Sequence, residues 1–147
     1  MPHLPYTFGP NGEVPAFQGK NATHEEIGAA YVDQVKFVNK EILNVIDTLI
    51  QDSKAPPVII VQGDHGPLPD LTEEPLQRLP ILNAYYLPGM QMDQLLYPSI
   101  SPVNSFRVVL DSYFGQDLPI LEDKSYFGPE DDRDANQLIP NSCVNAP

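Results

Sequence analysis

Prolines mark out the connections in this chain. Seventeen of its 147 residues are proline, and they cluster in the connections rather than in the two stretches that have helical periodicity. Because proline fixes φ and lacks a backbone donor, this pattern predicts few regular elements joined by long, shaped loops. The length fits one domain over residues 1–147. Residues 1–22 have no periodicity and are predicted to be irregular, and residues 127–147 are predicted to form a tail.

The clearest predicted helix covers residues 23–52. Thr23 and Glu26 fit a capping box at its start, and the Pro56-Pro57 pair prevents the helix from continuing past its end. Apolar residues recur along it at intervals of three and four, as they do on the inward face of an amphipathic helix. The stripe consists of Ile27, Ala30, Tyr31, Val35, Val38, Ile42, Val45, Ile46 and Leu49.

A second helix is predicted over residues 102–114. Pro102 suits the first helical turn, and Ser101 suits the cap position before it. The apolar residues that share a face of it are Val103, Phe106, Val109, Leu110 and Tyr113.

Two short apolar segments are predicted to be strands. Val58–Val61 is entirely β-branched, a pattern typical of a strand that is buried on both faces and pairs in parallel. Pro80–Leu87 is the second, and Tyr85 and Tyr86 must face opposite sides of it. A helix followed by a buried strand predicts an α/β fold with few parallel strands.

Asp64 and His65 follow the first strand directly and lie between two glycines. Ligands gather at the carboxyl ends of strands in open α/β sheets, and glycine allows the backbone to turn sharply there. A carboxylate oxygen and an imidazole nitrogen suit a divalent metal such as Zn²⁺ or Mn²⁺. A polar turn after the strand explains the same residues without a ligand, and further metal ligands must come from elsewhere.

The charge balance excludes several classes of partner. Twenty acidic residues against eight basic ones give a net charge of -12, which argues against binding nucleic acid or an anionic membrane surface. No apolar stretch is long enough to span a membrane. Residues 111–134 carry half of the net negative charge, which predicts a solvated acidic loop or, alternatively, a cation-binding loop.

Other reactive side chains fit no catalytic pattern. Ser99, Ser101 and Ser105 lie outside any Gly-x-Ser-x-Gly motif, and no histidine follows His65, so a serine hydrolase is not expected. Cys143 is the single cysteine and is expected to be an ordinary thiol. Arg107 is expected to pair with acidic residues or to reach an anionic substrate.

An ordered series of segments resembles the sulfatase-like hydrolases of the alkaline phosphatase superfamily. Its centre is the apolar strand that ends in Gly63-Asp64-His65-Gly66, preceded by a helix of the family's kind. The flanking segments that look like the family are His3-Leu4-Pro5, Tyr31-Val32-Asp33, Ile46-Asp47, Arg78-Leu79-Pro80-Ile81 and Ser101-Pro102-Val103-Asn104-Ser105-Phe106.

The resemblance implies a partial alkaline-phosphatase-like α/β sandwich and the cleavage or transfer of sulfate or phosphate esters. It implies that Asp64 and His65 are ligands of a divalent metal ion, with Mn, Zn, Mg and Ca as the candidates. It also implies that His3 contacts the substrate's phosphate or sulfate oxygens, or a second metal. An extracytoplasmic or membrane-associated place for the full-length protein would follow from the same resemblance.

The nucleophile segment of that family has no counterpart here, so no catalytic residue is expected in this chain. We expect the chain to be the C-terminal part of such an enzyme, with the N-terminal half missing, and to be inactive alone. The alternative is a non-catalytic interaction module that associates with itself, because a partial sheet exposes strand edges and apolar faces.

Overall fold

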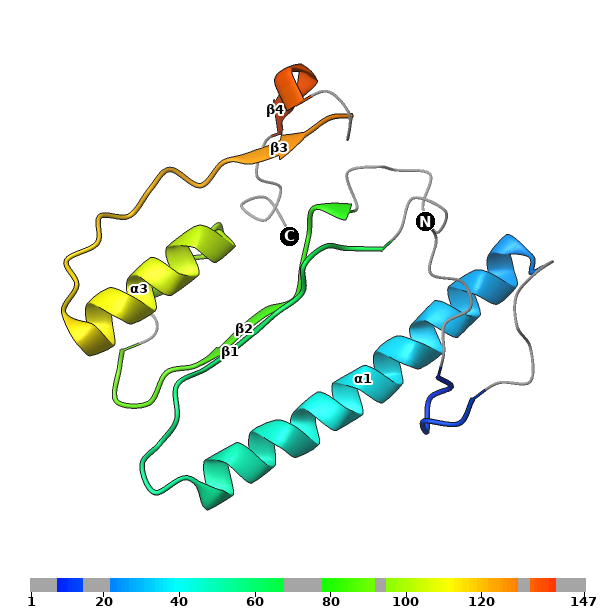
Figure 1. The fold of residues 1–147 in the computed structure, drawn as a ribbon, viewed down its shortest axis with the longest axis horizontal. Coiled ribbons are helices and arrows are strands. Elements are labelled where there is room, and N and C mark those ends of the chain that lie inside the picture. The colour runs from blue at the N-terminus through cyan, green and yellow to red at the C-terminus, as the bar shows by residue number, and fades with distance from the viewer. Residues whose placement is uncertain (1–7, 15–21, 68–77, 92–94, 130–132, 140–147) are drawn as a thin grey trace. The chain divides into compact units, whose positions relative to one another are not determined.

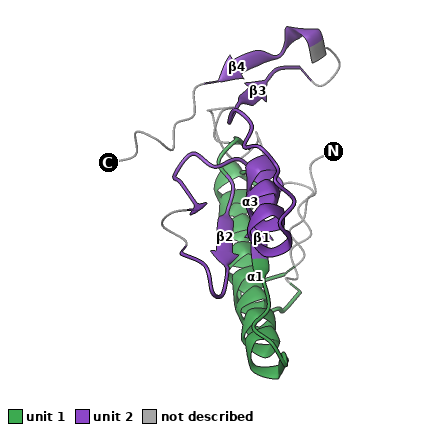
Figure 2. Ribbon diagram, turned by 90° about the vertical axis from the view of Figure 1, so that its left-hand side faces the viewer, with its two compact units in different colours: residues 1–59, 65–80 green, residues 60–64, 81–147 purple. Residues whose placement is uncertain are grey.

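The computed structural model describes residues 8–14, 22–67, 78–91, 95–129 and 133–139. The chain divides into two compact units, coloured separately in Figure 2. Unit 1 contains residues 1–59 and 65–80, and unit 2 contains residues 60–64 and 81–147. In the described part of the chain, no helix has the length and apolar character needed to cross a membrane.

Unit 1 is built on helix α1, His24–Asp52, which is the long cyan helix of Figure 1. The predicted capping box is present: the Glu26 amide donates to Thr23 Oγ1 over 3.2 Å, and the Thr23 amide donates to Glu26 Oε2 over 2.8 Å. The bonds to the Thr23 backbone and side chain hold the pKa of Glu26 below its usual value. The predicted helix is therefore confirmed with its cap.

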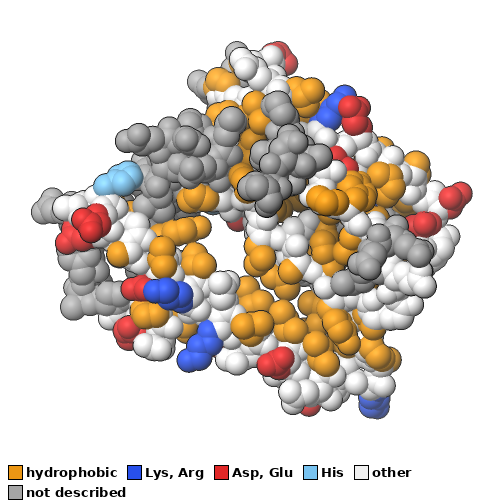
Figure 3. Space-filling model, turned by 180° about the vertical axis from the view of Figure 1, so that it is seen from behind, with side chains coloured by type: hydrophobic (Ala, Val, Ile, Leu, Met, Phe, Trp, Pro, Cys, Tyr) orange, Lys and Arg blue, Asp and Glu red, His pale blue; other side chains and the backbone are white. Residues whose placement is uncertain are grey.

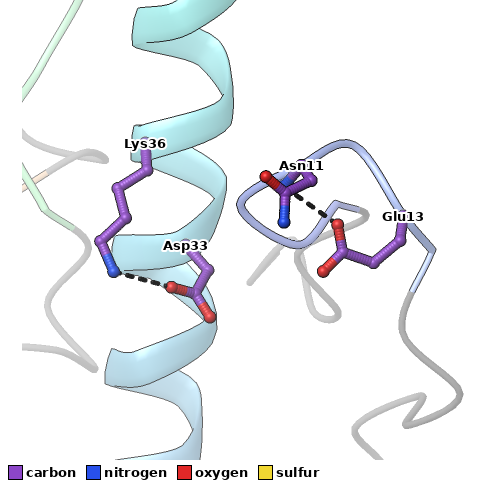
Figure 4. Close-up of polar contacts among 4 residues, drawn as sticks. All are labelled: Asn11, Glu13, Asp33 and Lys36. Carbon is purple, nitrogen blue, oxygen red and sulfur yellow. Dashed lines mark hydrogen bonds and ion pairs between the residues drawn. The ribbon is translucent and has the colours of Figure 1, made fainter.

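The segment 8–14 forms a turn that packs on α1. The rings of Phe8 and Phe37 lie with their centroids 5.0 Å apart, and Gly9 and Gly12 close the turn through a backbone bond of 3.0 Å. Figure 4 shows the local polar contacts, in which the Asn11 amide donates to Glu13 and Lys36 pairs with Asp33 on the helix.

The apolar stripe of α1 is only partly covered. No residue of α1 is buried. Four of the nine stripe residues are exposed, namely Val35, Val38, Val45 and Leu49, and the other five are half-buried. Figure 3 shows hydrophobic side chains, in orange, on the surface of the molecule.

Strands β1, Ile59–Gln62, and β2, Asn83–Tyr86, form a two-stranded sheet, and they run side by side in Figure 1. The pair is antiparallel, and all four residues of β1 are only half-buried. The prediction of a parallel strand buried on both faces is therefore wrong. A β-branched run favours extended backbone and packing, but it does not fix the direction of pairing. Tyr85 is half-buried and Tyr86 exposed, as their alternation predicts.

Helix α3, Pro102–Phe114, begins and ends at the predicted residues. Gly115 closes it in the left-handed region, at φ 59°, and its amide donates to Asp111 O over 2.8 Å. The apolar face indicated by the sequence is not the buried one, because three of its five members, Val103, Phe106 and Leu110, are exposed. The buried residues are Asn104, Ser105, Val108 and Val109.

The C-terminal part of unit 2 holds a second antiparallel pair. Strand β3, Ser125–Phe127, pairs with β4, Gln137–Ile139, with Tyr126 opposite Leu138. A short 3₁₀ helix, η3, covers Arg133–Ala135. Part of the predicted tail and part of the predicted acidic loop are thus ordered elements. The broad α/β expectation holds, because the described residues form helices together with two small sheets.

Candidate functional site

Asp64 and His65 are both exposed and directly follow β1 and Gly63, as the sequence predicts. The backbone on each side of them is hydrogen-bonded. In unit 2 the Gly63 amide donates to Leu82 O over 2.9 Å, and in unit 1 the Gly66 amide donates to Arg78 O over 2.7 Å. The two candidate ligands therefore lie on a turn whose flanking residues are anchored.

The His65 ring has a defined hydrogen bond. Its Nδ1 atom lies 2.7 Å from the carbonyl oxygen of Gly66. Because a carbonyl oxygen only accepts, Nδ1 carries the proton, and the lone pair of the neutral ring is on Nε2. Metal-binding histidines characteristically donate their other ring N–H to a carbonyl or carboxylate in this way. The donor set of Asp64 and His65 therefore fits a divalent metal ion.

Two ligands are fewer than a catalytic metal site usually has. A catalytic zinc has about three protein ligands. Among the residues that the structure describes, no group of three or more His, Cys, Asp or Glu side chains is arranged to hold a metal ion. His3 and Cys143, and acidic residues 130–132, lie outside the described ranges. Asp64 and His65 are neighbours in the sequence, at the point where unit 2 gives way to unit 1, and the roles of the pair and of His3 stay predictions.

Four polar side chains, which we call the Gln62 cluster, are hydrogen-bonded to one another at the end of β1 in unit 2. Gln62 Nε2 donates to Asn83 Oδ1 over 2.9 Å and to Ser105 Oγ over 3.2 Å, and Tyr85 OH bonds to the same Ser105 oxygen. The sequence analysis considered Ser105 only as a nucleophile. Its side chain is fully buried, so its position fits a structural role instead.

A second group of hydrogen-bonded residues, the Asp123 cluster, lies at the start of α3. Asp123 accepts from the Ser101 amide over 2.7 Å, from Tyr97 OH over 2.7 Å and from Asn104 Nδ2 over 2.9 Å. Asn104 also bonds to both the amide and the carbonyl of Leu121. Asp123 thus ties the first turn of α3 to the segment that returns along it.

The Asp123 cluster shifts the pKa values of its two acidic groups in opposite directions. Burial alone would raise the pKa of Asp123, but the hydrogen bonds from Ser101, Tyr97 and Asn104 stabilise the carboxylate and lower the pKa overall. Burial, followed by the bond to Asp123, raises the pKa of Tyr97. The cluster is therefore built to hold an ionised Asp123 and a neutral Tyr97.

The acidic segment 111–134 uses its described carboxylates mainly in local structure. Asp111 accepts from the Asp117 amide over 2.8 Å, and Glu122 pairs with Lys124 over 2.8 Å. Arg107 donates to Pro119 O over 2.9 Å, and this bond holds the loop through its backbone rather than through a carboxylate. These contacts favour the solvated-loop interpretation over a cation-binding loop.

Comparisons with known proteins add no relative to this account. No protein-family model, no curated protein and no solved structure matches the chain.

Proposed function

We propose that Asp64 and His65 supply two ligands of a divalent metal site in an enzyme that hydrolyses or transfers sulfate or phosphate esters. The observation that carries the proposal is the bond from His65 Nδ1 to Gly66 O, which leaves Nε2 as the nitrogen with the lone pair. The exposed carboxylate of Asp64, next to it in the chain, adds a second ligand of suitable chemistry.

The metal would polarise the ester and stabilise the negative charge that develops on its oxygens. Within this chain, Asp64 would offset the charge of the ion, and the Gly66 carbonyl would orient the His65 ring. His3 is proposed to contact the oxygens of the ester or a second metal ion. The nucleophile and the remaining ligands belong to residues other than this pair.

Isothermal titration with Zn²⁺ and with Mn²⁺ tests the proposal. His65→Ala and Asp64→Ala should each weaken binding by at least about tenfold, since each removes a ligand. His24→Ala and Asp47→Ala remove an exposed imidazole and an exposed carboxylate from α1 and should leave the affinity unchanged. Equal losses in all four variants would contradict the proposal, and so would binding that follows the acidic segment 111–134 instead.

Self-association is the second candidate function, and the exposed side of α3 favours it. Val103, Phe106 and Phe114 are each more than half exposed, at 57%, 53% and 66%, and they recur along one side of the helix. Apolar residues gathered in this way are typical of protein interfaces. We propose a second copy of the chain as the partner.

Sedimentation velocity over a range of concentrations tests this second candidate. The wild-type chain should form a dimer that Phe106→Glu weakens strongly, because the charge would have to be buried in the interface. Thr48→Glu on α1 introduces the same charge at another exposed helical position and should have no such effect. A wild-type chain that stays monomeric at all concentrations would contradict it.

A further inference from the structure

Gln62 ends strand β1 and stands two residues before Asp64. Its amide nitrogen has two hydrogens, and both have acceptors: Asn83 Oδ1 on β2, at 2.9 Å, and Ser105 Oγ on α3, at 3.2 Å. A side chain held from two elements has a single orientation. The end of the strand is therefore attached by its last side chain to both the neighbouring strand and the helix.

Ser105 is the fixed end of this attachment. It is fully buried, and its hydroxyl donates to Ser101 O over 3.1 Å. Because a hydroxyl has one hydrogen, its two lone pairs must accept the bonds from Gln62 and from Tyr85 OH. All of the bonding capacity of Ser105 is then used, and a fully satisfied buried network is rigid.

The hydrogen bonds that start at Gln62 continue through α3 to the Asp123 cluster. Ser105 lies on the buried side of α3 together with Val108 and Val109, and the next residue to it, Asn104, belongs to the Asp123 cluster. The first turn of α3 is thus held by the loop on one side and connected to Gln62 on the other. Of the residues before Asp64 in unit 2, Gln62 is the one whose side chain transmits this constraint.

We propose that Gln62 is a positioning residue: through Ser105 and Asn83 it fixes the strand end that carries Asp64, the candidate metal ligand of unit 2. This inference rests on the proposed metal site and adds to it the part of the fold that holds the site in place. Groups that orient metal ligands typically change metal affinity by about 10- to 100-fold when they are removed.

The test compares Gln62→Met with Tyr97→Phe. The first keeps the length of the side chain and removes both donors, whereas the second removes a hydrogen bond from the Asp123 cluster in the same unit. Two quantities are measured: the affinity for Zn²⁺ by titration, and hydrogen exchange at the Gly63 amide, which is bonded to Leu82 O. The Gly115 amide at the end of α3 serves as the internal reference.

Gln62→Met should weaken Zn²⁺ binding by about tenfold and speed exchange at Gly63 more than at Gly115. Tyr97→Phe should leave Zn²⁺ affinity unchanged even if it lowers stability as much. If Gln62→Met does not fold, Asn83→Ala, which removes only one acceptor, should show the same two changes to a smaller degree.

The His65→Ala titration separates the two possible failures. If His65→Ala loses affinity while Gln62→Met and Asn83→Ala bind like the wild type, the positioning role is wrong and the metal site stands. If His65→Ala binds Zn²⁺ as the wild type does, the metal site is wrong and the positioning role falls with it. Equal losses in Gln62→Met and Tyr97→Phe would mean that affinity merely follows stability, which also overturns the inference.

Discussion

Helices α1 and α3 have the same kind of apolar periodicity, yet they differ in which side chains are buried. α1 has a side-chain cap and a long apolar stripe, but none of its residues is buried. α3 buries Asn104 and Ser105 completely and exposes Val103 and Phe106. The difference teaches that periodicity predicts where a helix forms, whereas the hydrogen-bonding partners supplied by other segments decide which face is buried.

Removing the buried amide of α3 should give the largest effect. Asn104→Ala deletes the bonds to Tyr97, Leu121 and Asp123 and leaves buried groups without partners, so we expect the free energy of unfolding to fall by about 3 kcal/mol. Asn39→Ala, at an exposed position of α1, should change it by less than about 0.5 kcal/mol. Urea unfolding measures both, and equal effects would contradict the contrast between the helices.

The same valine-to-alanine substitution, made at a buried and at an exposed position, compares the two sides of α3. Val109→Ala removes buried apolar surface and should cost about 2 kcal/mol, because a cavity adds to the lost transfer free energy. Val103→Ala, on the exposed side, should cost less than about 0.5 kcal/mol. A larger cost for Val103→Ala than for Val109→Ala would contradict the observed burial of α3.

Acid should weaken unit 2 through Asp123. Its pKa is lower in the folded chain than in the unfolded one, so the unfolded state binds the proton more readily. The contribution to stability is therefore complete above the unfolded value of about 4 and is lost as pH falls through the folded value. Asp123→Asn should flatten the dependence of the urea midpoint on pH below about pH 5, while Asp47→Asn controls for the change in net charge. A slope unchanged in Asp123→Asn would rule out this origin.

The same glycine-to-alanine change should have opposite signs in the two helices. Gly28 is inside α1 with nothing within 4 Å of an added Cβ, so alanine should stabilise the chain by about 1 kcal/mol. Gly115 ends α3 at φ 59°, where the added Cβ also has space but the backbone becomes strained, so alanine should destabilise it by about 1 kcal/mol. Thermal unfolding of the two variants gives the signs, and the same sign in both would contradict the cap geometry.

Local signals in the sequence predict the helices well. The capping box at Thr23 and proline at position 102 act within one helical turn, and both helices begin where these signals lie. The direction of the β1–β2 pair and the buried side of α3 depend on partners far along the chain, as the bond between Gln62 and Ser105 shows. Strands β3 and β4 were not predicted, because three-residue strands leave no periodicity to detect.

For the candidate site, too, the sequence predicts the local features and misses the contacts between distant residues. The exposed position of Asp64 and His65 after β1 follows from the β-branched run and the glycines, and the structure places both there. The Gln62 cluster was missed, since no spacing rule connects residues 62, 83, 85 and 105. The metal-binding role of the pair, and the role of His3, stay predictions.

The most direct measurement is a Zn²⁺ titration of the isotope-labelled chain, followed by the NMR signals of its histidine rings. We predict that the His65 signals shift at Nε2, with Nδ1 remaining protonated toward Gly66 O, and that the His24 signals do not change. Signals of His65 that stay in place at saturating Zn²⁺, or that shift only as much as those of His24, would contradict the metal site.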